Sequence, residues 1–404
     1  MRSRSVVLPA TASLLPVPRI DAARVGGAEH SPIARDPAEA RRAPAEVRHA
    51  PAEARLAPAG VGAIPAEVVH VFAAGLYLAV GNSEGPRGTG RRLLPIMGPD
   101  ALVLPFGVSV PQLDSTHLAT LRAGTIARVI PAVSPMRLGS HPPIFEHHVP
   151  SPRWIGFPDF ALHIVRTHRP LRVKTQPWKG IDPTTLAALA GHLRPGLSDL
   201  GSRAGDLASA LLDEDVAATE AGVQALIGAG PGSTPSGDDA LSGIALALRS
   251  TGRNPPLDLL SRTVEPIDLA QATPALSAAL IRAAVAGHCV PEVAAAIEAA
   301  HTLLTTHRRE PPPRSAAFAT PAAGFPAVLS PLDRIGHSSG HDLFTGFLAA
   351  LTALTCSRPM RPGVSRSLSP PRPPTAATIC IRGGDGPRTP TQHSSKGTHP
   401  CHAH

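Results

Sequence analysis

The chain is poor in aromatic residues and in cysteine. Its 404 residues include 9 Phe, 2 Trp, 1 Tyr and 4 Cys. Proteins that bind single-stranded nucleic acids usually stack bases on aromatic side chains, so this scarcity argues against nucleic-acid binding. The cysteines show no CxxC spacing, which fits a reducing compartment without a disulfide framework. We therefore expect a cytoplasmic protein.

Long apolar runs are also missing. A membrane-spanning helix needs about 20 consecutive apolar residues, and no stretch reaches that length. The apolar run from Val6 to Val17 is broken by Pro9 and Pro16, and no small-residue cleavage site follows it. This start is a poor export signal, and we expect a soluble protein with no membrane segment.

The excess of basic residues lies at the two ends of the chain. The net charge is +8, but residues 1–62 and 357–404 together hold 16 of the 38 basic and only 7 of the 30 acidic residues. The segment between them is almost neutral, which again argues against a nucleic-acid partner. Residues 37–65 repeat a seven-residue unit that begins with proline, so no continuous helix can form there. We predict a disordered leader over 1–62, a folded domain over 63–356 and a disordered basic tail over 357–404.

The predicted domain is α+β, with a β-rich N-terminal half followed by an α-helical half. Short apolar runs predict strands over 68–72, 101–105 and, more weakly, 166–173. From about residue 183 the apolar spacing becomes helical. The predicted helices span 186–193, 204–212, 216–227, 240–248, 276–286, 293–304 and 343–354.

A glycine- and proline-rich loop, residues 228–239, leads directly into one of these helices. Ser236 is in position to cap this helix, and Asp239 follows three residues later as an acidic form of the capping box. Free amides at a helix N-terminus bind phosphate or carboxylate groups. No Gly-Lys-Ser/Thr follows, so the loop is not a nucleotide P-loop.

A second segment, residues 335–342, repeats this design at an offset of 103 residues. Aligning Ser236 with Ser339 also aligns two mid-helix glycines, Gly243 and Gly346. A mid-helix glycine costs about 1 kcal/mol relative to alanine, so the pair predicts a close backbone contact between the two helices. We expect the helices to cross there and to bring both loops to one cleft, the predicted active site. The structural alternative is that the aspartates only offset helix dipoles and the glycines only serve turns.

The two segments, Gly-x-Gly-Pro-Gly-x-Thr-Pro-Ser-Gly-Asp-Asp from Gly228 and Ile-Gly-His-Ser-Ser-Gly-x-Asp from Ile335, resemble the signatures of a bacterial family long catalogued as a domain of unknown function. This AllH-like family includes a subunit of the oxamate carbamoyltransferase of allantoin catabolism. The resemblance extends weakly over about 65–355 and excludes both tails.

The resemblance implies carbamoyl-transfer chemistry with oxamate, phosphate or carbamoyl phosphate as the small anionic substrate, and it implies partner enzyme subunits. His337 would act as general acid or base, and Asp238 would orient His337 or hold a magnesium ion (Mg2+) on the phosphate. No other cofactor and no protein-bound metal site are expected. Glycine amides and hydroxyl groups would stabilise the developing oxyanion. The expected substrate-binding residues are Gly230, Gly232, Thr234, Ser236, Gly237, Asp239, Ser338, Ser339, Gly340 and Asp342.

A different class of function stays open. The same cleft would hold a small acid without chemistry if the chain were a non-catalytic or structural subunit of a multi-protein complex, with catalysis on a partner chain. A kinase ranks last, because neither loop contains a lysine.

Overall fold

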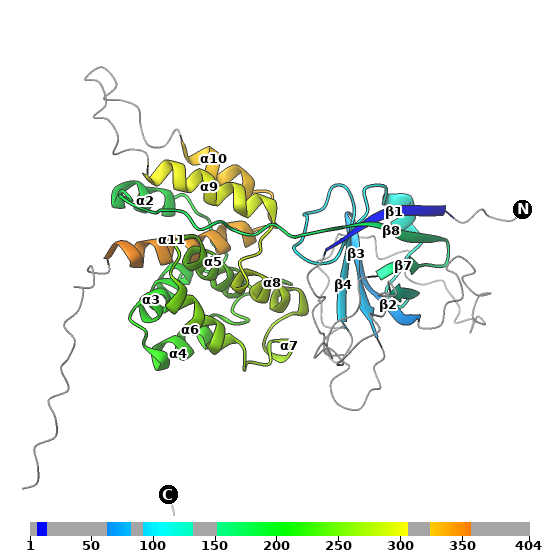
Figure 1. The fold of residues 1–404 in the computed structure, drawn as a ribbon, viewed down its shortest axis with the longest axis horizontal. Helices are drawn as coiled ribbons and strands as arrows, with labels where there is room; N and C mark the ends of the chain where they lie inside the picture. Colours follow the sequence, from blue (N-terminus) through cyan, green and yellow to red (C-terminus); the bar gives the residue numbers. More distant parts are fainter. Residues whose placement is uncertain (1–5, 14–62, 82–91, 132–151, 306–323, 357–404) are drawn as a thin grey trace, which may run out of the picture. The chain divides into compact units, whose positions relative to one another are not determined.

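The structure, a computed structural model, describes residues 6–13, 63–81, 92–131, 152–305 and 324–356. Strands come first along the chain and helices second (Figure 1), which confirms the predicted combination and order. The strands are β1 (Val6–Ser13), β2 (Ile64–Phe72), β3 (Gly75–Val80), β4 (Arg92–Met97), β5 (Val108–Ser109), β6 (Ile126–Pro131), β7 (Pro152–Gly156) and β8 (Phe160–His168).

The eight strands form a closed barrel in the order β1-β5-β4-β3-β2-β6-β7-β8. Most neighbours are antiparallel, whereas β1 pairs with β8, and β4 with β5, in parallel. Alternate residues of each strand point inward and fill the barrel with side chains such as Leu76, Leu78, Ile96, Ile155 and Leu162. The barrel interior is therefore an apolar core.

Strand β1 corrects one prediction. Residues 6–13 fall within the predicted disordered leader, yet they pair with β8 on one side and β5 on the other. Pro9 is tolerated in this strand, in register with His163. The prediction is therefore wrong for residues 6–13, while 14–62 and the predicted tail 357–404 lie outside the described residues.

The predicted strands agree with the structure unevenly. The strand over 68–72 lies within β2, and the segment 166–173 overlaps only the end of β8. Residues 101–105 are irregular, and their place in the barrel is taken by β4 and β5. An apolar run alone does not distinguish a strand from a buried connection.

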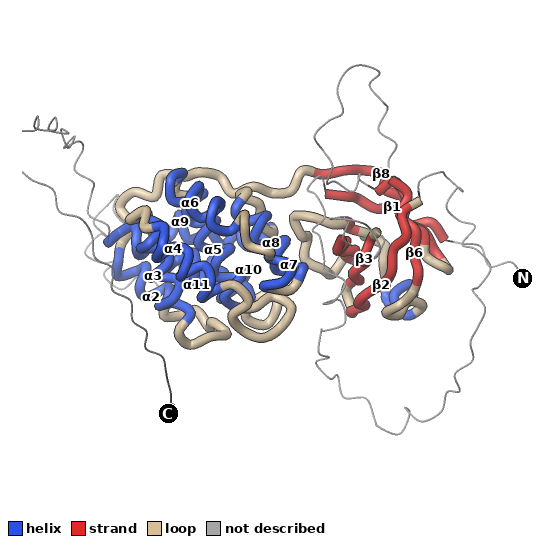
Figure 2. The backbone as a smooth tube through the Cα atoms, turned by 90° about the horizontal axis from the view of Figure 1, so that it is seen from below, coloured by secondary structure: helices blue, strands red, loops and turns tan. Residues whose placement is uncertain are grey.

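Each of the seven predicted helices corresponds to an observed one, and further helices lie between them (Figure 2). None of the helices in the described ranges is long and apolar enough to cross a membrane. The helices are α1 (Ser115–Ala119), α2 (Pro183–Ala190), α3 (Leu200–Leu212), α4 (Val216–Leu226), α5 (Ser236–Ser250), α6 (Asn254–Val264), α7 (Leu269–Ala272), α8 (Ala275–Val285), α9 (Pro291–Thr305), α10 (Phe325–Leu332) and α11 (Ser339–Cys356).

Helix α5 is the centre of the helical region. All of its residues except Arg249 are buried, and it packs against α3, α4, α6, α8 and α11. A helix that is enclosed on every side needs small and apolar residues all around its circumference. The sequence from Ala240 to Leu248 meets this need with alanines, leucines, one isoleucine, one serine and one glycine.

Candidate functional site

Helices α5 and α11 cross with their backbones in contact. A Cβ atom added to Gly243 would lie 1.8 Å from the carbonyl oxygen of Leu343, and one added to Gly346 would lie 2.0 Å from that of Ala240. No side chain larger than hydrogen fits at either position. The predicted crossing at the two glycines is confirmed.

The start of α5 is tied to the end of the preceding helix. The amide of Ala229 donates to the carbonyl of Leu226, the last residue of α4, and the amide of Gly237 donates to the carbonyl of Ala229. A Cβ atom on Gly237 would lie 2.0 Å from the Leu226 oxygen. Glycine in this first turn is therefore a packing requirement.

The start of α11 repeats these contacts. The amide of Ile335 donates to the carbonyl of Leu332, the last residue of α10, and the amide of Gly340 donates to the carbonyl of Ile335. A Cβ atom on Gly340 would lie 2.3 Å from the Leu332 oxygen. The sequence repeat is thus a repeat of structure, in which a helix, a loop and a second helix are joined in the same way.

These bonds correct the expected anion donors. The amides of Gly237 and Gly340 already donate within the chain, and so do those of Asp238 and Asp239, which point to the carbonyl of Pro235. Pro235 is the N-cap, and Ser236 is the first helical residue with no side-chain capping bond, so the predicted capping box is wrong. Of the four glycines expected to bind substrate, Gly232 is the one with no atom within 4 Å of its added Cβ.

The two helix starts meet at a third segment, which the sequence did not indicate. A Cβ atom on Gly196, between α2 and α3, would lie 2.7 Å from Ser236 Oγ, 2.9 Å from Ser338 Oγ and 3.3 Å from Asp342 Oδ2. The expected convergence of the two starts is confirmed, with Gly196 filling part of the space between them. The cleft itself stays a prediction.

Asp342 is fully engaged at this meeting point. Its Oδ1 accepts from the amide of Gly196 at 2.6 Å, and its Oδ2 accepts from Ser338 Oγ at 2.8 Å. The side chain is buried. These bonds make Asp342 an anchor for the segment around Gly196.

The neighbouring His341 performs a similar task, and the sequence analysis did not single it out. Its Nδ1 accepts from the amide of Arg194 at 3.3 Å, and its Nε2 lies 3.0 Å from Asp333 Oδ1. Because a backbone amide can only donate, the imidazole proton belongs on Nε2. His341 and Arg194 both hold Asp333 and keep its pKa below the ordinary value. In the sequence, the dipeptide Pro195-Gly196 is a common turn signal, but it does not indicate that this turn contacts the start of α11.

Asp238 is also satisfied within the chain. Its Oδ1 accepts from the amide of Gly228 at 2.8 Å, and its Oδ2 accepts from the hydroxyls of Ser277, at 2.6 Å, and Thr273. Burial raises the pKa of this carboxyl, and the three donors oppose the rise. None of these bonds reaches His337, which is exposed.

Asp239 differs from both of the other aspartates. It is 6% exposed, and its Oδ2 has no hydrogen-bond partner among the described residues. Burial raises its pKa well above the ordinary value, a hydrogen bond from Ser339 opposes the rise, and the charges of Asp342 and Asp238 add to it. The Ser339 hydroxyl in turn lies 2.8 Å from Thr234 Oγ1. A buried carboxylate oxygen without a donor is unusual and calls for a ligand or a proton.

The remaining expected site residues form a more accessible group beside the buried aspartates. Gly230, Thr234, Ser338 and Ser339 are partly exposed, and Gly232 is exposed. Gly230 has a positive φ of 111°, and its added Cβ would lie 2.9 Å from the amide nitrogen of Ser236. The structure thus places hydroxyl groups on the accessible side and carboxylates on the buried side.

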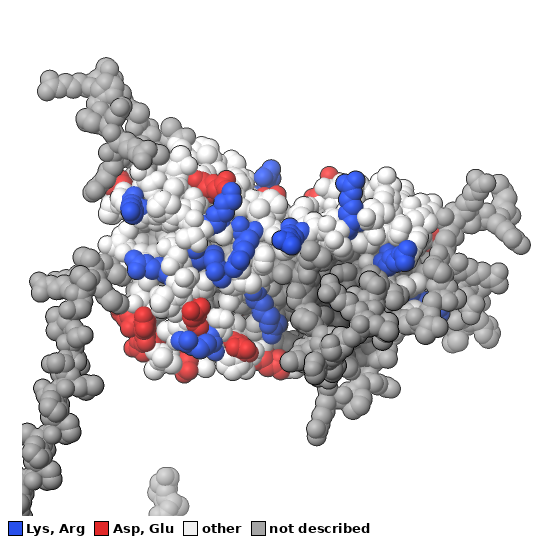
Figure 3. All heavy atoms as spheres, viewed as in Figure 1, with Lys and Arg blue, Asp and Glu red and all other residues white. Residues whose placement is uncertain are grey.

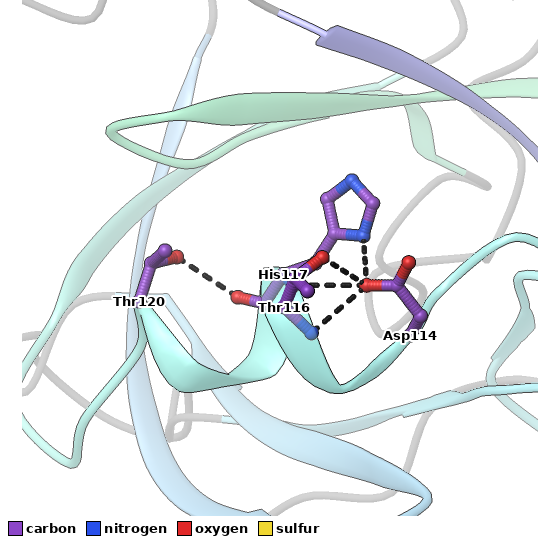
Figure 4. Close-up of polar contacts among 4 residues, drawn as sticks. All are labelled: Asp114, Thr116, His117 and Thr120. Atoms are coloured by element: carbon purple, nitrogen blue, oxygen red, sulfur yellow. Dashed lines mark hydrogen bonds and ion pairs between the residues drawn. The ribbon is translucent and has the colours of Figure 1, made fainter.

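One other carboxylate–histidine pair lies outside this site. Asp114 Oδ1 accepts from the amides of Thr116 and His117 and lies 2.7 Å from His117 Nδ1 (Figure 4). These bonds lower the pKa of Asp114, the bond from Thr116 being the largest cause. The arrangement caps the short helix α1 and accounts for the pair. Within the described ranges, no three His, Cys, Asp or Glu side chains are grouped to hold a metal ion.

Comparison with known proteins supports the resemblance. The family model described as oxamate carbamoyltransferase subunit AllH matches residues 226–351. No curated protein and no solved structure gives a significant match. The match begins at the last residue of α4 and includes both converging helix starts and the crossing glycines. The resemblance read from the two loops is therefore confirmed over residues 226–351, which are similar to a family whose description names a carbamoyltransferase subunit.

Proposed function

We propose that the chain is a subunit of a carbamoyltransferase-type enzyme that handles oxamate and carbamoyl phosphate, and that its small anionic substrate binds where α5 and α11 begin. The family match supports the type of chemistry. The convergence of Ser236, Ser338 and Asp342 around Gly196 supports the place. Partner subunits follow from the word subunit in the family description.

The observation that carries the proposal is the unpaired Oδ2 of Asp239. When a carbamoyl group passes from phosphate to the nitrogen of oxamate, an N–C bond forms, the C–O bond to phosphate breaks, and the nitrogen must lose a proton. An acceptor for that proton has to lie beside the nitrogen. Asp239 offers a free oxygen whose raised pKa makes it a stronger base than an ordinary carboxylate.

The groups around Asp239 suit the rest of such a substrate. The Ser339 hydroxyl donates to Asp239 and the Thr234 hydroxyl to Ser339, so this pair can accept from the N–H groups of oxamate, and open space adjoins the exposed Gly232. His337, being exposed, is placed as the group that exchanges protons with solvent or with phosphate. Asp238, with three donors of its own, is assigned to holding the loop in place.

The test is turnover of oxamate and carbamoyl phosphate by the chain assembled with its partner subunits. Asp239→Asn keeps the size of the side chain but cannot take the proton, so we expect turnover to fall at least a hundredfold. The matched control is Asp258→Asn, an exposed aspartate on α6, which should leave turnover unchanged. Turnover by Asp239→Asn within twofold of the wild type would overturn the role of Asp239.

A non-catalytic subunit that binds a small acid is the second candidate, because Asp238 and Asp342 have donors within the chain and hold segments in place. In that case oxamate would bind to the chain, as measured by calorimetry, while the partner subunits alone would show full turnover. Dependence of turnover on this chain and on Asp239 would exclude it.

A further inference from the structure

A pair of arginines lies at the opposite end of α5 from the proposed active site. Arg249 is in the last turn of α5, thirteen residues after Ser236 and therefore about 20 Å along the helix axis. A Cβ atom on Gly287 would lie 3.1 Å from Arg249 Nε and 3.3 Å from Arg172 Nε. The two guanidinium groups thus flank the same glycine.

The backbone holds these arginines together. The segment leading into α2 docks along the ends of α5 and α8, where the amide of Val173 donates to the carbonyl of Gly287 at 2.8 Å and that of Gln176 to Ser250 at 2.8 Å. Gly287 follows α8 with a positive φ of 90°, a conformation that favours glycine. Both guanidinium groups are therefore carried by docked segments.

Nothing nearby neutralises this pair by direct contact. Neither arginine forms an ion pair with a described residue, and the buried Nε of Arg249 has no hydrogen-bond partner among them. Among the described residues, the Arg249 guanidinium donates to the carbonyl of Val285 from a terminal nitrogen, over a long 3.5 Å. The free carbonyl groups at the C-terminal end of α5 stabilise the positive charge of Arg249, but they leave the Nε–H of Arg249 without an acceptor.

The surroundings are basic as well. Residues 160–181 contain no Asp or Glu, and they contain Arg166, Arg169, Arg172, Lys174 and Lys179. Figure 3 shows Lys and Arg side chains gathered across the middle of the helical region, with Asp and Glu side chains above them and along its lower edge. The charges that act on Arg249 are that of Arg172, the larger effect, and that of Asp258 on α6, so the field at this end of α5 favours an anion.

We infer that Arg172 and Arg249 form a binding site for a carboxylate or phosphate group, separate from the site at the start of α5. The planar guanidinium groups present several donors in a fork that matches the oxygens of such groups. The ligand has two sources, a free small anion or an acidic side chain of a partner subunit. The free-anion source does not depend on the proposed carbamoyltransferase function, whereas the partner source rests on the subunits which that function implies.

The first test is calorimetric titration of the full chain with inorganic phosphate and with succinate at constant ionic strength. If the ligand is a free anion, Arg249→Gln and Arg172→Gln should each weaken binding at least tenfold. Arg262→Gln, an exposed arginine in the last turn of α6, should bind as the wild type does. Arg172 is exposed, so its variant is expected to fold even if that of Arg249 does not.

The second test is assembly with the partner subunits. If the ligand is an acidic side chain, neither anion binds the isolated chain, but Arg172→Gln and Arg249→Gln weaken assembly at least tenfold while Arg262→Gln does not. Anion binding that is lost only in Ser339→Ala would overturn the inference. So would variants that equal the wild type in both anion binding and assembly.

Discussion

The starts of α5 and α11 share a backbone plan but differ in their polar side chains. Both have a first-turn glycine packed on the last carbonyl of the preceding helix, and both cross at a mid-helix glycine. At α11 both carboxylate oxygens of Asp342 accept a hydrogen bond, whereas at α5 Asp239 Oδ2 has no donor in the part of the chain that the structure describes. The start of α11 therefore has a structural role, whereas the start of α5 has a carboxylate oxygen that a ligand could satisfy.

The largest expected effect on stability concerns the glycine crossing that α5 and α11 share. Gly243→Ala would drive a methyl group into the carbonyl of Leu343, so we expect the free energy of unfolding to fall by about 3 kcal/mol. Gly205→Ala in α3 is the control, because an added Cβ there meets no atom within 4 Å, and it should raise stability by up to about 1 kcal/mol. Chemical denaturation followed by circular dichroism measures the stability of both variants. Equal stabilities of Gly243→Ala and Gly205→Ala would contradict a close crossing of α5 and α11.

The next effect separates the two helix starts. Asp342→Ala removes the acceptor of the Gly196 amide and the Ser338 hydroxyl, and should lower the free energy of unfolding by about 2 kcal/mol. Asp239→Asn removes a buried charge that has one unpaired oxygen, and should leave stability unchanged or raise it. The same denaturation experiment compares them. If Asp239→Asn lowered the free energy of unfolding more than Asp342→Ala, Asp239 would be the structural residue and the contrast between the two helix starts would be wrong.

The pH dependence sharpens the same contrast. Because the pKa of Asp239 in the folded chain lies well above the ordinary value of 3.8, the folded state holds this proton more tightly than the unfolded state. Stability linked to Asp239 is therefore full below 3.8 and is lost as the pH rises through the folded pKa. The free energy of unfolding, measured from pH 4 upward, should fall less steeply with pH in Asp239→Asn than in the wild type. An unchanged profile would contradict the raised pKa.

The smallest effect concerns single hydroxyl groups. Thr234→Val removes the hydrogen bond to Ser339, and Ser338→Ala removes the one to Asp342. Each should cost about 1 kcal/mol of unfolding free energy, with Ser338→Ala the greater because it leaves a buried carboxylate oxygen without its donor. Thermal unfolding of the two variants side by side measures the difference. A larger loss of stability in Thr234→Val than in Ser338→Ala would mean that the start of α5, and not that of α11, has the structural role.

Much of the helical half could be predicted from the sequence. Apolar periodicity indicated seven helices, and the paired glycines indicated the crossing of α5 and α11. Helices α6 and α10 were not predicted; both have proline in the first turn, a position that tolerates it. Strand β1 was missed because it lies 50 residues before its nearest described neighbour in sequence and its partners are still farther along the chain.

The site was predicted in outline only. Ser236 and Ser339 were correctly placed at two converging helices, but the roles of the aspartates depend on partners distant in sequence. Asp238 is satisfied by Thr273 and Ser277, and Asp342 by Gly196. No local pattern marks these contacts, so the sequence could not show that Asp239 is the carboxylate left with a free oxygen.

The parallel pairing of β1 with β8 has a consequence for biosynthesis. The strand that completes the barrel is the first to leave the ribosome, yet its partner ends at His168. Closure must therefore wait until well over a hundred further residues have been translated, and such long-range pairing is slow to form. Until β8 is translated, β1 has the two-residue strand β5 as its available neighbour, so most of this apolar strand stays unpaired and prone to aggregation.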